Sequence, residues 1–399
     1  MKHPFNMSTA WVYPFAVLCL LSLSSCQIKD KREAEEQQSQ IQSDMTKAED
    51  RTSFRTEGGF ATGETASQPR TLRIMSYNVE NLFDTLDDPD TEDEDFTPGG
   101  YYKWNNSKYQ KKLRQLASVI SDLGEWDFPA LVGLVEVENL EVVMDLVKAD
   151  PIRKADYRLG VSRGADPRGI DVALLWNPKN FRQVEAYEIP HYGNPLYYPL
   201  RRDPRTKRER WGKGRSSLWV VLEEKSSGEL YDVIVVHLPS RRGGTRSTSE
   251  KREEVNGKIN RVLDVIERER ETPRIILMGD LNDSPGNISV RDSLRSEGVK
   301  EAHGSFRRDH LYNLASGLEE RGLGTHYFDR SLWLPDQIMV SGALLDPRSH
   351  ARFKDEKEVI FSPKYMVSGK GPKRSFKGPR FVSSGFSDHF PVYADLTIE

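Results

Sequence analysis

The sequence has almost no cysteine. Cys19 and Cys26 are the only two in 399 residues, and both lie within the first 26 positions. The rest of the chain therefore has no disulfide, no thiolate metal site and no cysteine nucleophile. Any metal bound there must be held by oxygen and imidazole ligands.

A net positive charge is also lacking. The chain has 58 basic and 61 acidic residues, and residues 1–26 contain Lys2 but no acid, so the remainder has 57 against 61, or -4. This balance excludes a globally basic surface for nucleic acid.

Long hydrophobic runs are absent as well. The apolar run at residues 11–23 spans 13 positions, whereas a transmembrane helix needs about 20. Residues 1–26 are therefore predicted to be an export signal. Its end, Leu23-Ser24-Ser25-Cys26, resembles the lipobox of bacterial lipoproteins, which implies lipidation of Cys26. An ordinary cleaved signal and an uncleaved anchor remain alternatives.

Large apolar side chains are nearly missing from residues 27–70, which are rich in Glu, Gln, Ser and Lys. Such a segment cannot bury enough surface to fold, and we predict a flexible tether. Residues 71–399 show no internal repeat and no Pro/Gly/Ser-rich linker, so one folded domain is predicted there.

Strand-like and helix-like blocks alternate from residue 71, which predicts a layered α/β domain. Two amphipathic helices are predicted, at 108–124 and 248–271. Their apolar faces are formed by Leu113, Leu116, Val119, Ile120 and Leu123, and by Val255, Ile259, Val262 and Ile266. Strands are predicted at 71–81, 130–139, 170–176, 216–224, 231–240, 274–283, 335–345 and 390–398.

Several predicted strands end in side chains that can do chemistry. Each has a plain alternative, because Asn and Asp make turns and a lone histidine at a strand end is more often structural than catalytic. In layered α/β folds, however, strand ends are where sites assemble, and a shared site explains all of them together. These side chains are Asn78, Glu136, His237, Asp280 with Asn282, and Asp388 with His389.

The blocks IMSYNVEN, LVEVEN, GIDVALLW, VVHLPSRRGG, GDLND, PDQIMVS and SDHFPV occur in this order. Together they resemble the endonuclease/exonuclease/phosphatase superfamily, the DNase I-like metal-dependent phosphodiesterases, over residues 71–399. The resemblance implies a four-layer α/β/β/α sandwich with its site at one edge of the sheets. It also implies hydrolysis of a phosphate ester with Mg²⁺, or Mn²⁺, as cofactor.

The same resemblance implies a metal site. Glu136 is the first expected ligand, with Asn78 beside it, and Asp388 completes the set. Carboxylate and amide oxygens are what a hard cation such as Mg²⁺ prefers.

It implies catalytic roles too. Asp280 positions or deprotonates the attacking water, and Asn282 holds a phosphoryl oxygen. His389 acts as a base or as a phosphate contact, with its imidazole oriented by Asp336, and His237 lies near the leaving group.

Three charged loops are open to two interpretations. Arg241 and Arg242 are expected to grip a phosphate, although a solvated loop is an equal alternative. The basic segment 201–215 can track a polyanion or be a solvated face. The acidic loop 84–100 lacks the order of an EF-hand, so a solvated loop is favoured there, and near the site it would repel long polyanions.

Some positions depart from the family pattern. Val135 stands where many members have glutamine, Val137-Glu138-Asn139 replaces the basic residue of abasic-site repair nucleases, and IMSYNVEN lacks the tryptophan common after that strand. These departures, and export, argue against DNA repair.

The leading interpretation is an exported, Mg²⁺-dependent, endonuclease-like phosphodiesterase that cleaves extracytoplasmic nucleic acid. It would be anchored through Cys26 to a bacterial membrane, on its periplasmic or cell-surface face, with no protein partner evident. The first alternative keeps the chemistry but acts on phospholipid head groups or inositol phosphates. The second is a non-catalytic binding lipoprotein of the same fold.

Overall fold

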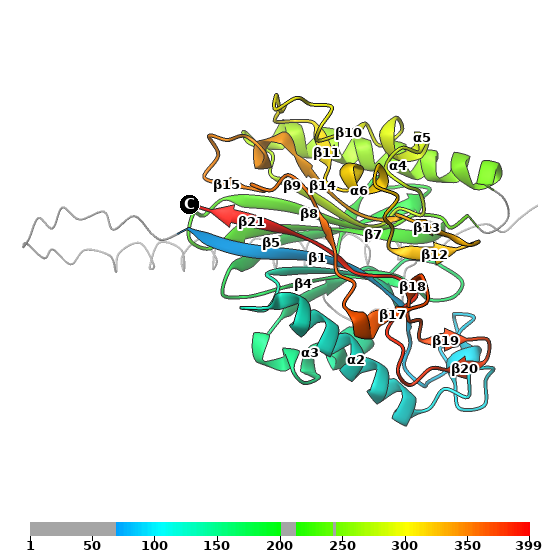
Figure 1. The fold of residues 1–399 in the computed structure, drawn as a ribbon. Helices are drawn as coiled ribbons and strands as arrows, with labels where there is room; N and C mark the ends of the chain where they lie inside the picture. Colours follow the sequence, from blue (N-terminus) through cyan, green and yellow to red (C-terminus); the bar gives the residue numbers. More distant parts are fainter. Residues whose placement is uncertain (1–68, 201–212, 242–244) are drawn as a thin grey trace, which may run out of the picture. The chain divides into compact units, whose positions relative to one another are not determined.

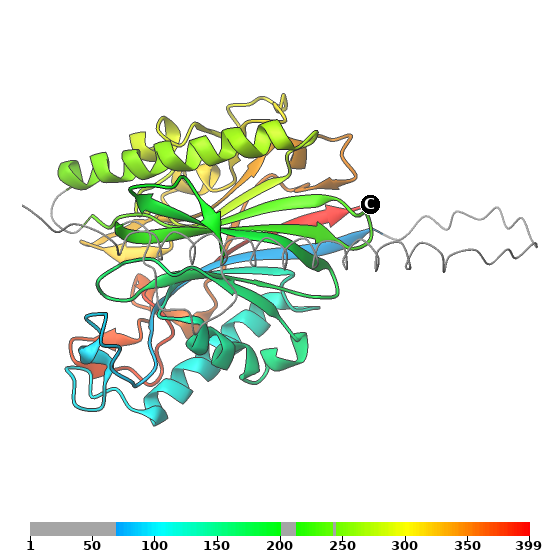
Figure 2. The same cartoon turned by 180° about the vertical axis from the view of Figure 1, so that it is seen from behind.

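Two β-sheets pack face to face, and helices cover the outer face of each (Figures 1 and 2). This computed structural model describes residues 69–200, 213–241 and 245–399. Both sheets lie within one compact unit, Ser67–Glu399. The described residues include no helix long and apolar enough to cross a bilayer. The predicted signal 1–26, nearly all of the tether and most of the basic segment lie outside the described residues.

The first sheet contains, in spatial order, β15 (Ala351–Arg352), β21 (Val392–Ile398), β1 (Arg70–Leu82), β2 (Leu131–Val137), β4 (Asp171–Trp176) and β3 (Arg158–Val161), and β16 (Val359–Ile360) also pairs with β21. The second contains β10 (Ser296–Gly298), β11 (Leu311–Asn313), β14 (Asp336–Ser341), β9 (Ile275–Asp280), β8 (Leu230–His237), β7 (Lys213–Glu224), β5 (Phe181–Tyr192) and β6 (Tyr198–Pro199).

Helices α2 (Asn106–Gly124) and α3 (Leu140–Lys148) lie on the first sheet, and α4 (Thr245–Glu269) lies on the second (Figure 1). The remaining helical turns are η1 (Glu94–Phe96), η2 (Ile152–Ala155), α5 (Ile288–Arg291), α6 (Ser316–Glu319), η3 (Gly342–Leu344) and η4 (Lys364–Met366). Three small hairpins pair β12 (His326–Phe328) with β13 (Ser331–Trp333), β17 (Val367–Ser368) with β18 (Gly371–Pro372), and β19 (Phe376–Lys377) with β20 (Arg380–Phe381).

Strand alternation divides the apolar side chains among the layers. On β8, Val233 and Val235 face the other sheet, while Ile234 and Val236 face α4. Because successive residues point to opposite faces and both faces are covered, this strand reads as an uninterrupted apolar run. The predicted apolar faces of both helices are buried, among them Leu116 of α2. The predicted four-layer α/β/β/α sandwich is therefore confirmed.

Sequence patterns did not predict β5 or α3. β5 mixes buried and exposed residues without a clean period of two, because it lies near the edge of the sheet beside the short β6. α3 begins directly after β2, where Asn139 accepts a hydrogen bond from the Val142 N–H at 2.9 Å. This cap starts the helix and leaves the end of β2 fixed.

Candidate active site

Three neighbouring strands of the second sheet bring His237, Asp280 and Asp336 into one row. His237 of β8 is in register with Asp280 of β9, and Asp280 is in register with Asp336 of β14. All three side chains are buried. The ends of these strands therefore present two carboxyl groups and an imidazole at one edge of the sheet.

The turn after β9 depends on unusual backbone. Gly279 has a φ of 143°, and a Cβ there would lie 2.0 Å from the Val236 carbonyl oxygen, so only glycine lets β8 and β9 approach at this point. Asn282 follows with a φ of 53°. Its N–H donates to Asp280 Oδ1 at 2.8 Å, and its side-chain amide donates to the Leu238 carbonyl at 2.9 Å.

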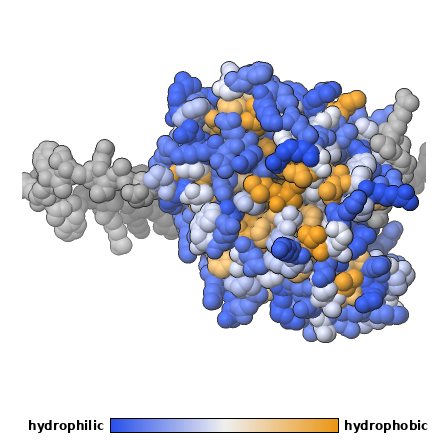
Figure 3. All heavy atoms as spheres, in the orientation of Figure 1, coloured by the Kyte–Doolittle hydropathy of each residue, from blue (hydrophilic) through white to orange (hydrophobic). Residues whose placement is uncertain are grey.

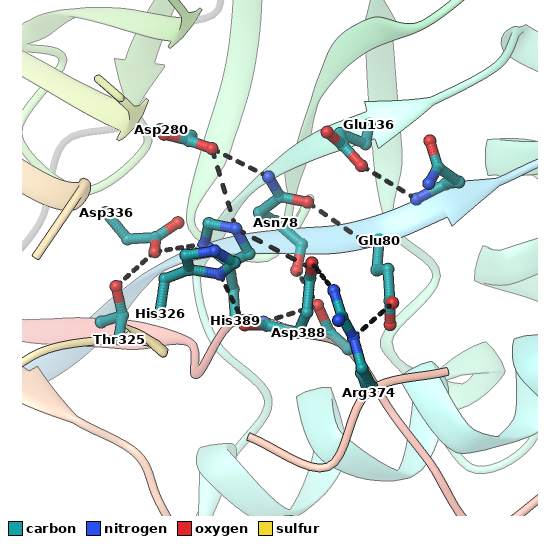
Figure 4. Close-up of polar contacts among 12 residues, drawn as sticks. Asn78, Glu80, Glu136, Asp280, Thr325, His326, Asp336, Arg374, Asp388 and His389 are labelled. Atoms are coloured by element: carbon teal, nitrogen blue, oxygen red, sulfur yellow. Dashed lines mark hydrogen bonds and ion pairs between the residues drawn. The ribbon is translucent and has the colours of Figure 1, made fainter. Parts of the chain in front are cut away.

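The first sheet contributes Asn78 and Glu136 at irregularities in β1 and β2. The register of both strands shifts just beyond Asn78 and Val135, and Glu136 has a φ of 67°. Bulges of this kind re-aim a side chain at the end of a strand. The Asn78 amide donates to Asp280 Oδ2 at 2.9 Å, which joins the two sheets, and Glu136 Oε2 accepts the Asn81 N–H at 3.2 Å (Figure 4).

Asp388 and His389 lie on the segment just before β21. His389 Nδ1 lies 2.7 Å from Asp336 Oδ2, which also accepts the Thr325 hydroxyl (Figure 4). His389 Nε2 faces Asp280 Oδ2 at 4.0 Å and Asp388 Oδ1 at 3.9 Å. The expected contact between Asp336 and His389 is thus present, and Nε2 is the nitrogen left for chemistry.

Burial and charge set opposite protonation states for the two histidines. Burial alone would lower the pKa of His389, but the adjacent Asp336 carboxylate raises that pKa well above its ordinary value. Burial, reinforced by Arg215, lowers the pKa of His237 well below its usual range. His237 is therefore neutral, and its Nε2 lies 3.9 Å from Glu136 Oε1 and 3.8 Å from Asp280 Oδ2.

Asp280 has a pKa that suits proton transfer near neutral pH. Burial raises the pKa of its carboxyl group to about 6, although the nearby His389 cation opposes this rise. A group that exchanges its proton near the working pH is an effective general base.

The sequence matches the model of the endonuclease/exonuclease/phosphatase family over residues 73–398. The chain belongs to this family. Members of the endonuclease/exonuclease/phosphatase family are hydrolytic enzymes, generally dependent on a divalent metal. No curated protein matches the sequence.

Several solved structures are similar to this chain. A family member from Bacteroides thetaiotaomicron is 18% identical, with 83% of this chain and 99% of that chain covered and a TM-score of 0.50. Another from Bacteroides vulgatus is 15% identical, with coverages of 83% and 100% and a TM-score of 0.49. A mannosyl-6-phosphatase from Bacteroides thetaiotaomicron is 17% identical, with coverages of 82% and 99% and a TM-score of 0.48. At these identities the comparisons concern the fold alone.

The donor set at the site fits the metal dependence of the endonuclease/exonuclease/phosphatase family. Glu136, Asn78 and Asp388 offer carboxylate and amide oxygens, the donors preferred by Mg²⁺. Glu136 Oε1 lies 3.9 Å from Nε2 of the neutral His237, and Asp388 Oδ1 lies 3.9 Å from His389 Nε2. That Glu136, Asn78 and Asp388 together hold the ion stays a prediction. Ligand atoms of Asp388 and His389 also cluster with His326, and those of Asp280 and Asp336 cluster with His389.

Of the two predicted phosphate-binding arginines, only Arg241 lies among the described residues. Arg241 Nε donates to Asp283 Oδ1 at 2.7 Å, Nη2 donates to Asn287 at 3.0 Å, and the guanidinium lies 4.1 Å from the Trp333 ring centre. Asp283 also accepts hydrogen bonds from Arg252 and Ser289. Arg242 lies outside the described residues. Phosphate binding by either arginine stays a prediction.

The acidic loop packs next to the edge of the site. Glu92 N–H donates to the Pro167 carbonyl at 2.7 Å, and Asp93 is buried and accepts the Asp88 N–H. Glu138, directly after β2, accepts the Asp84 N–H at 2.7 Å. The loop is therefore an ordered neighbour of Glu136 rather than a wholly solvated segment.

Four residues at the site went unnoticed in the sequence. His326 stacks on His389 with ring centroids 4.4 Å apart, and its Nδ1 lies 2.9 Å from the Asp388 carbonyl oxygen. Thr325 contacts Asp336, and Arg374 contacts both Glu80 and Asp388 (Figure 4). Glu80 lies within the block IMSYNVEN, which was a usable signal, whereas Arg374 is one of many cations in its segment.

Proposed function

We propose that the protein is a Mg²⁺-dependent phosphodiester hydrolase that cleaves nucleic acid in the manner of an endonuclease. The observation that carries the proposal is that Asn78 and Asp280 meet the Asp336–His389 pair at one edge of the two sheets. A binding module has no need of a buried base beside a buried imidazolium.

The arrangement supports attack of water on phosphorus. Asp280 accepts the proton of the water, and the Asn78 amide and the Asn282 N–H hold its carboxyl group in place. His389, kept cationic by Asp336, donates through Nε2 to a phosphoryl oxygen and stabilises charge that develops in the transition state. A bound divalent cation would polarise the phosphoryl group.

Aromatic side chains beside the site support a nucleic-acid substrate. The hairpin β12–β13 carries the exposed Phe328 and the half-buried Trp333, and His326 of the same hairpin stacks on His389. Phe328 and Trp333 rings lie 6.5 Å apart. Unpaired bases stack on such rings with about 1–3 kcal/mol each, so a base next to the scissile phosphate would be held here.

The same region also favours a second candidate, hydrolysis of phospholipid head groups or of inositol phosphates. Apolar side chains gather near the middle of the face in Figure 3. Exposed large apolar residues near the site include Leu323, Tyr327 and Val367. Exposed apolar surface of this kind fits a lipid interface, and the ordered acidic loop disfavours a long polyanion.

We further propose that the protein is exported and lipid-anchored at Cys26. Support comes from the apolar run that ends in Leu23-Ser24-Ser25-Cys26. Mass spectrometry of the N-terminal peptide from membranes should find a lipidated cysteine at position 26, and an unmodified peptide that starts elsewhere would refute the anchor.

The deciding experiment is nicking of supercoiled plasmid, with cleavage of a single-stranded oligonucleotide in parallel. The purified protein is assayed with Mg²⁺, with EDTA, and as the Asp280→Ala and His389→Ala variants. We expect cleavage that requires both Mg²⁺ and these side chains. Cleavage retained in either variant would contradict the assignment. If neither substrate is cleaved, phospholipid and inositol phosphate esters are tested, and inactivity on all of them favours a non-catalytic binding protein.

A further inference from the structure

Arg374 places a guanidinium group directly beside the candidate metal ligands. Its Nη2 donates to Asp388 Oδ2 at 2.8 Å, and its Nε lies 3.5 Å from Glu80 Oε1 (Figure 4). The side chain is nevertheless 55% exposed, although Glu80 is only 5% exposed and Asp388 21%. Two nitrogens of the guanidinium are thus held by protein, while more than half of the side-chain surface is open to solvent.

The backbone around Arg374 is fixed from the other side by Glu80. This buried residue has a φ of 54° at the irregular end of β1, and its carboxyl oxygens accept the N–H groups of Ser375 and Phe376. The buried Lys112 donates to Ser375 Oγ at 2.7 Å. Glu80 is therefore satisfied by backbone donors and does not depend on Arg374.

The other arginines near the site have no comparable exposure. Arg241 is 21% exposed and is engaged by Asp283 and Asn287. Arg215 is 10% exposed, pairs with Asp166 at 3.0 Å and donates to the Leu238 carbonyl at 2.7 Å. Both groups support the turns that carry the site. Among the described arginines in contact with candidate site residues, Arg374 is the one whose side chain is more than half exposed.

We propose that Arg374 binds the phosphate group of the substrate, with Glu80 as the residue that positions it. The inference rests on the proposed function, since it assumes a phosphate ester at this edge. A planar guanidinium can donate two parallel hydrogen bonds to two oxygens of one phosphate. Asp280, Asp336 and Asp388 place negative charge around the site, so a further cation beside His389 and the metal favours an anionic substrate.

The test measures phosphate binding separately from turnover. Full-length protein in detergent is titrated with inorganic phosphate by calorimetry in the presence of Mg²⁺, and Mn²⁺ binding is followed by electron paramagnetic resonance. Arg374→Gln should weaken phosphate binding about 10- to 100-fold, the loss expected for hydrogen bonds from a charged group. Mn²⁺ affinity should stay within about twofold. Arg374→Lys should bind phosphate with intermediate affinity, because the ammonium group keeps the positive charge but cannot donate two parallel hydrogen bonds as the guanidinium does.

Arg380→Gln is the matched control, because Arg380 is an exposed arginine on β20, close to Arg374 in the sequence. It should bind phosphate like the wild type. Glu80→Gln should weaken phosphate binding less than Arg374→Gln does, and thermal unfolding of every variant verifies the fold. Unchanged phosphate binding in Arg374→Gln would overturn the proposal. So would an equal loss of Mn²⁺ and phosphate binding, because Arg374 would then act only through Asp388.

The outcomes also separate this inference from the proposed function. Weaker phosphate binding in Arg374→Gln, with no cleavage of any nucleic acid by the wild type, supports the phosphate site and refutes the nuclease. Cleavage by the wild type, with the same KM and phosphate affinity in Arg374→Gln, supports the nuclease and refutes the phosphate site.

Discussion

Glu138 makes the stability of the protein depend on pH in a way that one substitution can remove. The side chain is only 2% exposed. Burial, reinforced by the carboxylates of Asp84, Asp93 and Asp88, raises its pKa to about 9 against the smaller opposing effect of the Asp84 N–H. In the unfolded chain a glutamate has a pKa of about 4.3. The folded protein therefore keeps a proton that the unfolded chain releases.

The sign and size of the effect follow from linkage. A raised pKa in the folded state gives stability that is fully present below about pH 4.3 and is lost as the pH rises toward 9. One retained proton changes the free energy of unfolding by about 1.4 kcal/mol per pH unit. Between pH 6 and pH 8 the contribution of Glu138 should fall by about 2.5 kcal/mol.

Glu138→Gln imitates the protonated form and should remove this slope. Urea unfolding at pH 6 and pH 8 in EDTA, followed by tryptophan fluorescence, compares the variant with the wild type. The stability difference between the two proteins should shift by about 2.5 kcal/mol in favour of the variant on going to pH 8. Glu141→Gln, an exposed glutamate in the first turn of α3, should leave the slope unchanged. Parallel pH profiles for the wild type and Glu138→Gln would show that Glu138 is ionised in the folded protein, which would refute the reasoning.

Other expectations concern the site itself. Asp336→Asn replaces the anion 2.7 Å from His389. It should lower kcat by about 100-fold with little change in Tm. A kcat within twofold of the wild-type value would contradict the role of Asp336. Gly279→Ala should lower the free energy of unfolding by more than about 2 kcal/mol in urea titration, because its Cβ would meet the Val236 carbonyl; a Tm equal to that of the wild type would contradict this. EDTA should abolish turnover without changing the far-ultraviolet circular dichroism, and Mg²⁺ should restore it; activity that survives exhaustive chelation would argue against the oxygen-ligand metal site.

Local patterns predicted the buried strands and the polar residues at their ends, because both features depend on residues that are adjacent in the sequence. The run before Asp280 is apolar on both faces, and a strand buried between a sheet and a helix requires this. The register between paired strands cannot be predicted in this way. That His237, Asp280 and Asp336 form one row depends on pairing between strands that are about 40 to 100 residues apart, and no local pattern specifies it.

The same limit applies to charged side chains. Arg241 and Arg374 look alike in sequence, since each is a cation in a loop with glycine nearby. Their environments separate them: Asp283 engages Arg241 in the fold, whereas Arg374 stays half open beside Asp388. Whether an arginine is satisfied by its neighbours depends on tertiary contacts, which composition and spacing do not contain.

The first and last strands of the domain lie side by side, since β1 pairs with β21 from Arg70–Ile398 to Ser76–Val392. Asp388 and His389 come just before β21, so a ribosome must pass residue 389 before the site can close. A growing or prematurely terminated chain that stops before residue 388 can have Asp280 and Glu136 but lacks Asp388 and the imidazole of His389. If the protein hydrolyses nucleic acid as proposed, this order of synthesis would withhold activity from unfinished chains and so protect the cell that makes them.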